Sequence, residues 1–311
     1  MLKYIIKRLI AMIPVIVGIT LLVFFIMQLA PGDVARQILG PEAPEEAVQA
    51  LREELGLNDP LLVQYGRYMI NLVQGDLGTS YVNGRPIADE IFTSGRLGAT
   101  LRLALTSAVV SIILAIPLGV IAAIKQNTLF DYTSMAVSLV GISMPAFWLA
   151  LMLMLLFSVN LGWFPVQGDE DGWRSYVLPS IAIGFMNMAA IARTTRSSML
   201  DTIRQDYIRT ARSKGISERE VILHHAFRNA LIPTVTVVGV QLGGLIGGAV
   251  LTETVFAWPG LGRYIVTSVN GRDTPAVMGC IIVLAVGFSL VNLLVDLLYG
   301  FIDPRVRSMY K

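Results

Sequence analysis

The sequence predicts an all-α integral membrane protein with six transmembrane helices. Of its 311 residues, 54% are hydrophobic and 15% are charged, whereas soluble domains carry roughly 25% charged residues. Six apolar segments are candidates for crossing a hydrocarbon core of about 30 Å. The charges between these segments are also divided unevenly between the two sides of the predicted topology. Together these observations favour a multi-pass membrane protein over a soluble domain.

The six predicted spans are residues 9–30, 99–124, 135–159, 177–191, 234–251 and 276–301. The first follows Lys3, Lys7 and Arg8, as the apolar core of a signal peptide would. It is nevertheless roughly 20 residues long, which is enough to cross a bilayer, and no small-residue cleavage site follows it. We therefore expect an uncleaved first span. The fourth is the weakest, because Gly184 and Asn187 interrupt it.

The distribution of charge orients these spans. With the N-terminus in the cytoplasm, the inner segments hold 15 Lys and Arg against 6 Asp and Glu, and the outer segments hold 9 against 15. One acid, Asp296, lies within the last span. Because cytoplasmic segments are enriched in Lys and Arg, both termini are expected to be cytoplasmic.

The outer segment after the first span, residues 31–97, is expected to contain structure of its own. Helices are predicted at 45–55, closed by Gly56, and at 62–72, with a break at residues 75–78. A connection of this length usually has a task. It is either a receptor for an external partner or a lid on the outer mouth of the protein.

The cytoplasmic stretch 201–233 is predicted to form two short amphipathic helices. The apolar face of the first would comprise Leu200, Ile203, Tyr207, Ile208 and Ala211. Gly215 would end this helix in a left-handed conformation, and Ser217 with Glu220 forms a capping-box pattern for the second. The second helix would carry Val221, Ile222, Ala226 and Phe227 on its apolar side, and Pro233 would mark the start of the fifth span.

Ala211 and Gly215, four residues apart, should lie on one helix face with Tyr207 beside them. Because both are small, this face would admit a close approach by another protein. From the residues alone, two interpretations of the hairpin have equal weight: a helix pair lying in the lipid headgroups and a docking site for a cytoplasmic partner. Nucleic-acid binding is a poor alternative for a short insert between spans.

No catalytic, cofactor-binding or metal-binding constellation is present in the sequence. It lacks a GxxxxGK phosphate loop and an HExxH motif, and the adjacent His224 and His225 would point about 100° apart on a helix. Asp296 is either a functional intramembrane acid or a residue near enough to the cytoplasmic end to be paired there. A secondary transporter would need more such acids and usually inverted repeats. In the fifth span, Gly239, Gly243 and Gly247 favour close helix contact, within the chain or with another subunit.

Several motifs carry a resemblance to a known family. Residues 206–215 (DYIRTARSKG) through 229–233 (NALIP) resemble the EAA loop of binding-protein-dependent ABC importer permeases. Residues 55–61, 74–78, 253–262 and 292–299, with Asp303-Pro304-Arg305, are similar to the peptide/nickel branch of that family. The long outer loop resembles that of the B-type permease of dipeptide or oligopeptide importers, and residues 40–43 resemble glutathione importers. Arg209 and Thr210 depart from the general EAA pattern, whereas Ala211 and Gly215 fit it.

The resemblance implies a single permease domain over residues 1–311, with an external loop at 31–97 and a cytoplasmic coupling loop at 198–233. It implies the type I ABC importer fold and a place in the cytoplasmic (inner) membrane of a bacterium or archaeon. The implied partners are a second homologous permease, two ABC ATPase subunits that bind ATP and Mg, an extracytoplasmic substrate-binding protein and the lipid bilayer.

The resemblance also assigns roles to residues. It implies that the ATPase-coupling residues are Asp206, Tyr207, Arg209, Thr210, Ala211, Lys214 and Gly215. Candidates for the pathway or for packing are Asp296, Asn292, Glu253 and Trp258. The implied substrates, in descending order of expectation, are dipeptides, longer peptides, glutathione and nickel complexes.

Overall fold

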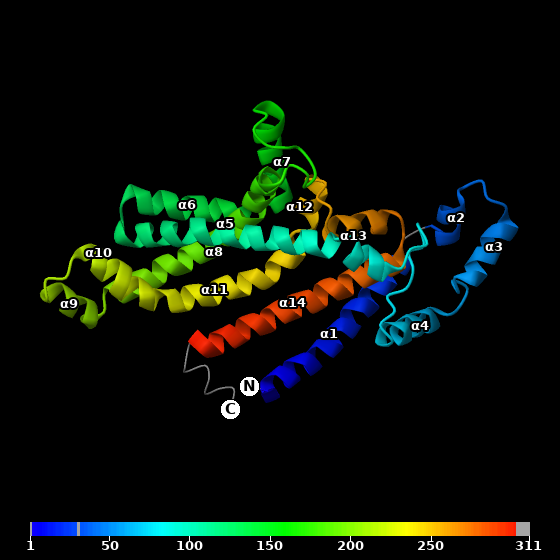
Figure 1. Ribbon diagram of the computed structural model, residues 1–311, viewed down its shortest axis with the longest axis horizontal. Coiled ribbons are helices and arrows are strands. Elements are labelled where there is room, and N and C mark those ends of the chain that lie inside the picture. Colours follow the sequence, from blue (N-terminus) through cyan, green and yellow to red (C-terminus); the bar gives the residue numbers. More distant parts are fainter. Residues whose placement is uncertain (1, 30–31, 303–311) are drawn as a thin grey trace. The chain divides into compact units, whose positions relative to one another are not determined.

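The computed structural model describes residues 2–29 and 32–302, and helices dominate this part of the chain (Figure 1). Within these residues the only β pairing is an isolated bridge between Thr79 and Pro86. Five helices are long and apolar enough to cross a membrane, or six if a bent pair is counted as one span. The predicted all-α class with about six spans is therefore confirmed. The motif residues Asp303, Pro304 and Arg305 lie outside the described residues.

The described chain forms two compact units. One, called here the outer-loop unit, comprises Leu2–Thr100 and Pro259–Ser289. The other, called here the bundle unit, comprises Leu101–Trp258 with residues 290–302. Two long helices run through both units, α5 (Arg96–Ile124) and α14 (Thr274–Ile302).

The outer-loop unit contains the first long helix and the short helices that follow it. These are α1 (Leu2–Leu29), α2 (Val34–Leu39), α3 (Glu45–Glu54), α4 (Leu61–Val73), the π-helical turn η1 (Asp89–Thr93) and α13 (Leu261–Asn270). The helices predicted at 45–55 and 62–72 are confirmed as α3 and α4. Gly56, with φ of +65°, lies directly after the C-cap of α3, as expected for a glycine stop. A buried cluster joins residues 77–91 to α13 and α14, and it comprises Leu77, Ile87, Ile91, Leu261, Ala276 and Cys280.

The bundle unit is built around α8 (Trp173–Ile203), which packs against α6 (Leu129–Ser143), α7 (Ala146–Leu153) and α11 (Phe227–Gly248) (Figure 1). The unit also contains the π-helical turn η2 (Met154–Asn160) and α12 (Val250–Val255). Close contact between α5 and α8 depends on glycine. A Cβ added to Gly119 would stand 2.6 Å from the carbonyl oxygen of Ala192. Gly184 is as tightly placed, 3.0 Å from the carbonyl oxygen of Ser107, so it is a packing residue rather than an interruption.

The third predicted span is not one straight helix. The segments Leu129–Gly141 and Ala146–Asn160 are bent by 105° relative to each other. Met144, which precedes Pro145, has an extended conformation with ψ of 133°. A proline disfavours the helical conformation in the residue before it and removes a backbone donor. The bend therefore lies at residues 144–145.

Two other predicted boundaries are wrong. The fourth span is not confined to 177–191, because α8 continues unbroken from Trp173 to Ile203. Pro233 does not begin the fifth span but lies inside α11. Prolines are tolerated within membrane helices where neighbouring groups satisfy the freed carbonyls, so in this sequence a proline is a weak boundary signal.

Candidate functional site

The candidate site is the hairpin of residues 204–226, which joins α8 to α11. It comprises α9 (Asp206–Ser213), α10 (Glu218–Glu220) and the π-helical turn η3 (Val221–Ala226). The prediction that Leu200 and Ile203 share one helix with Tyr207 is wrong, because α8 ends at Ile203. Gln205, with φ of −72° and ψ of 150°, is extended and redirects the chain before α9 begins.

The turn between α9 and α10 forms as the sequence predicts. Gly215 adopts φ of +77°, in the left-handed region that favours glycine. Ser217 caps α10, because the backbone N–H of Glu220 donates to its Oγ at 3.4 Å. Arg212 spans the turn to Glu218 with two hydrogen bonds, of 3.0 Å from Nε and 2.6 Å from a terminal nitrogen.

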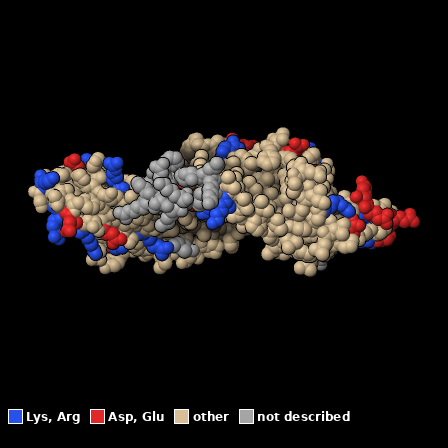
Figure 2. All heavy atoms as spheres, turned by 90° about the horizontal axis from the view of Figure 1, so that it is seen from below, with Lys and Arg blue, Asp and Glu red and all other residues tan. Residues whose placement is uncertain are grey.

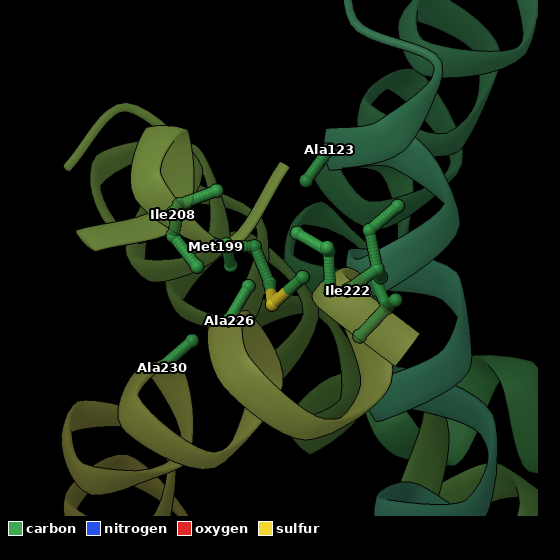
Figure 3. Packing of buried hydrophobic residues seen from close by; sticks show 9 residues of the cluster. Ala123, Met199, Ile208, Ile222, Ala226 and Ala230 are labelled. Carbon is green, nitrogen blue, oxygen red and sulfur yellow. The ribbon is translucent and has the colours of Figure 1, made fainter. Parts of the chain in front are cut away.

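The inner face of the hairpin is apolar and packs on the ends of α5 and α8 (Figure 3). Ile208, Val221 and Met199 have no exposed surface. The complete cluster of buried residues is Val120, Ala123, Met199, Ile208, Ala211, Val221, Ile222, Ala226 and Ala230. Burying one large apolar side chain contributes roughly 1.5–3 kcal/mol. The hairpin is therefore held on the bundle by its own core.

Two polar contacts fix the edges of α9. Asn229, at the start of α11, donates from Nδ2 to the Tyr207 hydroxyl at 2.8 Å. Arg204 donates to the side-chain oxygen of Gln126, in the α5–α6 connection, at 3.3 Å. These contacts connect the hairpin to α11 and to the α5–α6 connection, so a displacement of α9 has direct routes into the bundle.

The outer face of the hairpin differs from the predicted one. Gly215 is exposed, and nothing lies within 4 Å of a Cβ added there. Ala211, by contrast, is 7% exposed and belongs to the buried cluster, so the expectation that it lies on an open face is wrong. The helix turn from Asp206 places Ala211 on the same side as Ile208, three residues earlier, and that side faces the bundle. The other predicted coupling residues are exposed, namely Asp206, Tyr207, Arg209, Thr210 and Lys214.

The exposed face is rich in cations and also carries apolar side chains. Figure 2 shows Lys and Arg gathered over the end of the bundle unit that carries α9 and α10. Tyr207 is 44% exposed and Leu223 is 51% exposed. An open hollow on η3 and α10 is lined by Ser217, Arg219, Glu220, Leu223 and His224. The sequence had indicated Val221 and Ile222 as the apolar side of this arm, and it gave no sign that Leu223 would remain exposed.

An ion pair near the hairpin, with a buried carboxylate and a partly exposed guanidinium, was not anticipated from the sequence. Arg196 of α8 contacts Asp131 of α6 through two hydrogen bonds, of 2.5 Å from Nε and 2.6 Å from a terminal nitrogen. Asp131 is 1% exposed and also accepts from the backbone N–H of Asn127 at 3.0 Å. The sequence carried no signal for this pair, because Asp131 lies in the first turn of α6 and both residues fall outside the predicted spans.

The four candidate pathway or packing residues lie apart from the hairpin. Trp258 has no exposed surface, and its ring packs edge-on against Tyr176 with centroids 4.7 Å apart. Glu253 is also fully buried, in α12. Asn292 and Asp296 are half-buried in α14. The amide of Asn292 lies where a Cβ on Gly243 would stand, 2.6 Å from its Oδ1, so one of the glycines of the fifth span serves packing within the chain.

Among the described residues, no three His, Cys, Asp or Glu side chains are grouped so that they could hold a metal ion. His224 and His225 lie with their rings edge to face, and the ring centroids are 5.5 Å apart.

Two family models match the chain. Residues 115–308 match the family model described as binding-protein-dependent transport system inner membrane component. Residues 1–104 match the model of the N-terminal part of such membrane components.

Two similar curated proteins are full-length relatives. The dipeptide transport system permease protein DppB of Alkalihalophilus pseudofirmus is 47% identical, over 99% of this chain and 100% of that protein. The glutathione transport system permease protein GsiC of Escherichia coli K12 is also 47% identical, over 99% of both chains.

A solved structure shares the fold. The MetNI methionine ABC transporter in an inward-facing conformation aligns with a TM-score of 0.56 and 17% identity, covering 66% of this chain and 94% of that chain. With the family models matching most of the sequence, the chain belongs to the inner membrane components of binding-protein-dependent transport systems.

Proposed function

We propose that this chain is a permease subunit of an ATP-driven importer that moves dipeptides or longer peptides into the cytoplasm. It is not itself the ATPase: ATP and Mg bind to partner ATPase subunits, and a second homologous permease completes the membrane pathway. An extracytoplasmic binding protein delivers the substrate. The observation that carries the proposal is the hairpin, which is packed on the bundle by its inner face and open on its outer face.

The hairpin has the properties of a mechanical coupling element. Its buried cluster includes residues of α5, α8 and α11, so a force on α9 reaches three long helices. Its exposed face offers Tyr207 and Leu223 as apolar contacts among cations. We assign the ATPase contact to Asp206, Tyr207, Arg209, Thr210, Lys214 and Gly215, together with the exposed side chain of Leu223. Ala211 contributes by closing the hairpin onto the bundle.

Substitutions at the turn test this assignment. Gly215→Asp should lower the free energy of unfolding by only about 1 kcal/mol, which is the cost of placing a residue with a Cβ in the left-handed conformation. No steric cost is added, because nothing lies within 4 Å of a Cβ built at Gly215. Assembly with the ATPases should survive, while uptake and substrate-stimulated ATP hydrolysis fall together. Ser217→Asp is the matched control, since aspartate is an equally good N-cap. If Gly215→Asp transports as well as Ser217→Asp, the hairpin is not the coupling element.

The proposed composition of the complex can be tested separately. Affinity purification of the tagged chain from native membranes should recover a second permease and two ATPase subunits. Recovery of a stable, transport-competent single chain would contradict the importer and favour a secondary transporter.

We also propose that both termini are cytoplasmic and that residues 31–97 are external. Single cysteines at Glu46 and Glu170, placed in a Cys280→Ala background, should react with an impermeant thiol reagent from outside intact cells. A cysteine at Glu218 should react only after the membrane is opened. All three positions are exposed on the described surface, so burial within this chain does not prevent their reaction. Labelling of the Glu218 cysteine in intact cells would reverse the orientation.

The substrate is assigned by relatives rather than by geometry. A dipeptide permease and a glutathione permease are equally similar at 47% identity, and glutathione is itself a short peptide. Calorimetric titration of the cognate binding protein with dipeptides, tetrapeptides and glutathione should give the tightest binding for a peptide. Selective binding of a nickel complex would overturn the peptide assignment while leaving the coupling proposal intact.

A further inference from the structure

The helix α4 of the external loop has an unpartnered apolar face. At about 100° per residue, Leu62, Val63, Gly66, Ile70 and Val73 fall within one arc of roughly a quarter of the helix circumference. Leu62 is 71% exposed, Ile70 is 61% exposed and Val73 is 84% exposed. In water this stripe would be unfavourable, since each such side chain gains roughly 1.5–3 kcal/mol on leaving water.

A neighbouring side of α4 is fixed against the first membrane span. The Tyr65 hydroxyl lies 3.0 Å from the Thr20 hydroxyl of α1, and it also donates to the carbonyl oxygen of Val17 at 3.2 Å. The Tyr65 ring packs against Phe24, with centroids 5.6 Å apart. Near the outer end of α1, Gln28 donates to the side-chain oxygen of Gln64 at 3.5 Å.

These contacts set the depth of α4. The first candidate span ends at Leu29, and Thr20 precedes this end by nine residues, which corresponds to about 13 Å along a helix. Half of a hydrocarbon core of about 30 Å is about 15 Å. The contacts of α4 with α1 therefore lie alongside the outer leaflet and not above it. At this depth an exposed leucine or valine is next to acyl chains.

The charge of α4 is placed consistently with this depth. Arg67 is the only charged residue within the helix, and its guanidinium pairs with Asp59 in the turn that precedes α4. The pair draws the charged end of the side chain back toward the start of the helix, near the level of Gln64 and Gln28. Long basic side chains in membrane-embedded helices reach toward the interface in this way.

We infer that α4 is embedded in the outer leaflet, with Leu62, Ile70 and Val73 in contact with lipid acyl chains. The first candidate span, to which α4 is bonded, is itself largely open, since only 11% of its 18-residue apolar window is buried. A lipid-embedded α4 would fix the outer-loop unit at the membrane surface and leave the acidic α3, whose Glu46 is exposed, in water. Part of the external loop would thus be a membrane anchor rather than a lid or a receptor.

Collision experiments on spin labels distinguish the occupants of this face. The full-length chain, co-purified with its subunits and carrying Cys280→Ala, is labelled at Ile70→Cys or at Glu46→Cys and reconstituted into phosphatidylcholine–phosphatidylglycerol vesicles. The label at position 70 should collide several-fold more often with oxygen than with a water-soluble nickel chelate, and the label at position 46 should show the reverse. This result does not depend on the substrate or on the coupling role of the hairpin.

Two outcomes would overturn the inference. If the label at position 70 collides mainly with the nickel chelate, the face is in water and available to the binding protein. If it collides poorly with both reagents, another protein subunit covers it. A label at Val73→Cys, one turn further along the same face, should repeat the result at position 70, and this guards against a local disturbance by a single label.

Discussion

The ion pair of Arg196 and Asp131 makes the sharpest prediction about how the bundle is held together. Asp131 is 1% exposed in the wild type, and Arg196→Met removes the guanidinium and leaves its carboxylate with the Asn127 N–H as the remaining donor among the described residues. Breaking a buried ion pair by removing one partner costs roughly 3–5 kcal/mol. That loss corresponds to a fall in the apparent melting midpoint of roughly 6–20 °C.

A second substitution separates the lost contact from the uncompensated charge. In Arg196→Met with Asp131→Asn, position 131 is neutral, and its side-chain oxygen still accepts from the N–H of Asn127. Much of the cost of breaking the pair is the charge left behind, so the double variant should be more stable than Arg196→Met alone. This recovery is the signature of a desolvated pair and would not occur for a surface pair.

The assay is thermal unfolding of the detergent-purified complex, followed by fluorescence-detected size exclusion. Arg193→Met is the matched control, because Arg193 lies in the same helix, three residues earlier, and is exposed. The reasoning is refuted if Arg196→Met and Arg193→Met have the same melting midpoint. It is also refuted if the double variant is no more stable than Arg196→Met. Since the pair joins α6 to α8 close to the hairpin, uptake should fall in the same order as stability.

Three further predictions concern other parts of the fold. Gly119→Ala should lower the free energy of unfolding by roughly 1–3 kcal/mol, because the added methyl group overpacks α5 against α8. Gly98→Ala in the same helix is the control: nothing lies within 4 Å of its added Cβ, so it should not destabilise the protein. Ala211→Glu should make the hairpin sensitive to protease by placing a charge in its core, which limited proteolysis will detect; resistance equal to wild type would contradict its burial. In the outer-loop unit, burial acts to raise the pKa of Asp33. Hydrogen bonds from the Arg52 side chain and from the backbone, together with the positive charge of Arg52, outweigh burial, so the pKa of Asp33 is lowered below 3.8. Because the pKa of Asp33 is lower in the folded state, its ionised carboxylate stabilises the fold at pH values above the unfolded-state pKa. This stabilisation is lost as the pH falls through the folded-state pKa. The protection of α2 amides, measured as the ratio of the intrinsic to the observed exchange rate, should therefore fall below about pH 4 in wild type, and Asp33→Asn should remove this dependence.

The sequence determined the features that depend on neighbouring residues. Gly215 and Ser217 form the expected turn and cap, because each acts on backbone groups within three residues of itself. Helices α3 and α4 were also predicted, because their helical pattern likewise depends on neighbouring residues. Mean hydropathy over windows of about 20 residues was enough for the membrane class, since a bilayer selects on length and apolarity alone.

Tertiary structure decided what covers each apolar face. Periodicity placed Ala211 on a face with Ile208, but it could not say whether a partner protein or the bundle itself lies against that face. The same ambiguity applies to α4, where Tyr65 meets α1 while Ile70 is left open. Apolar residues in a membrane protein face either lipid or protein, and both environments favour the same side chains.

Partners distant in sequence were likewise beyond prediction. Arg196 and Asp131 are 65 residues apart, and nothing local to either one names the other. Pro145 and Pro233 carry the same local signal, yet one coincides with a bend of 105° and the other lies inside a continuous helix. Whether a proline ends a membrane helix depends on which groups can satisfy the carbonyl it frees. Those groups are supplied by neighbouring helices, which only the folded chain brings into place.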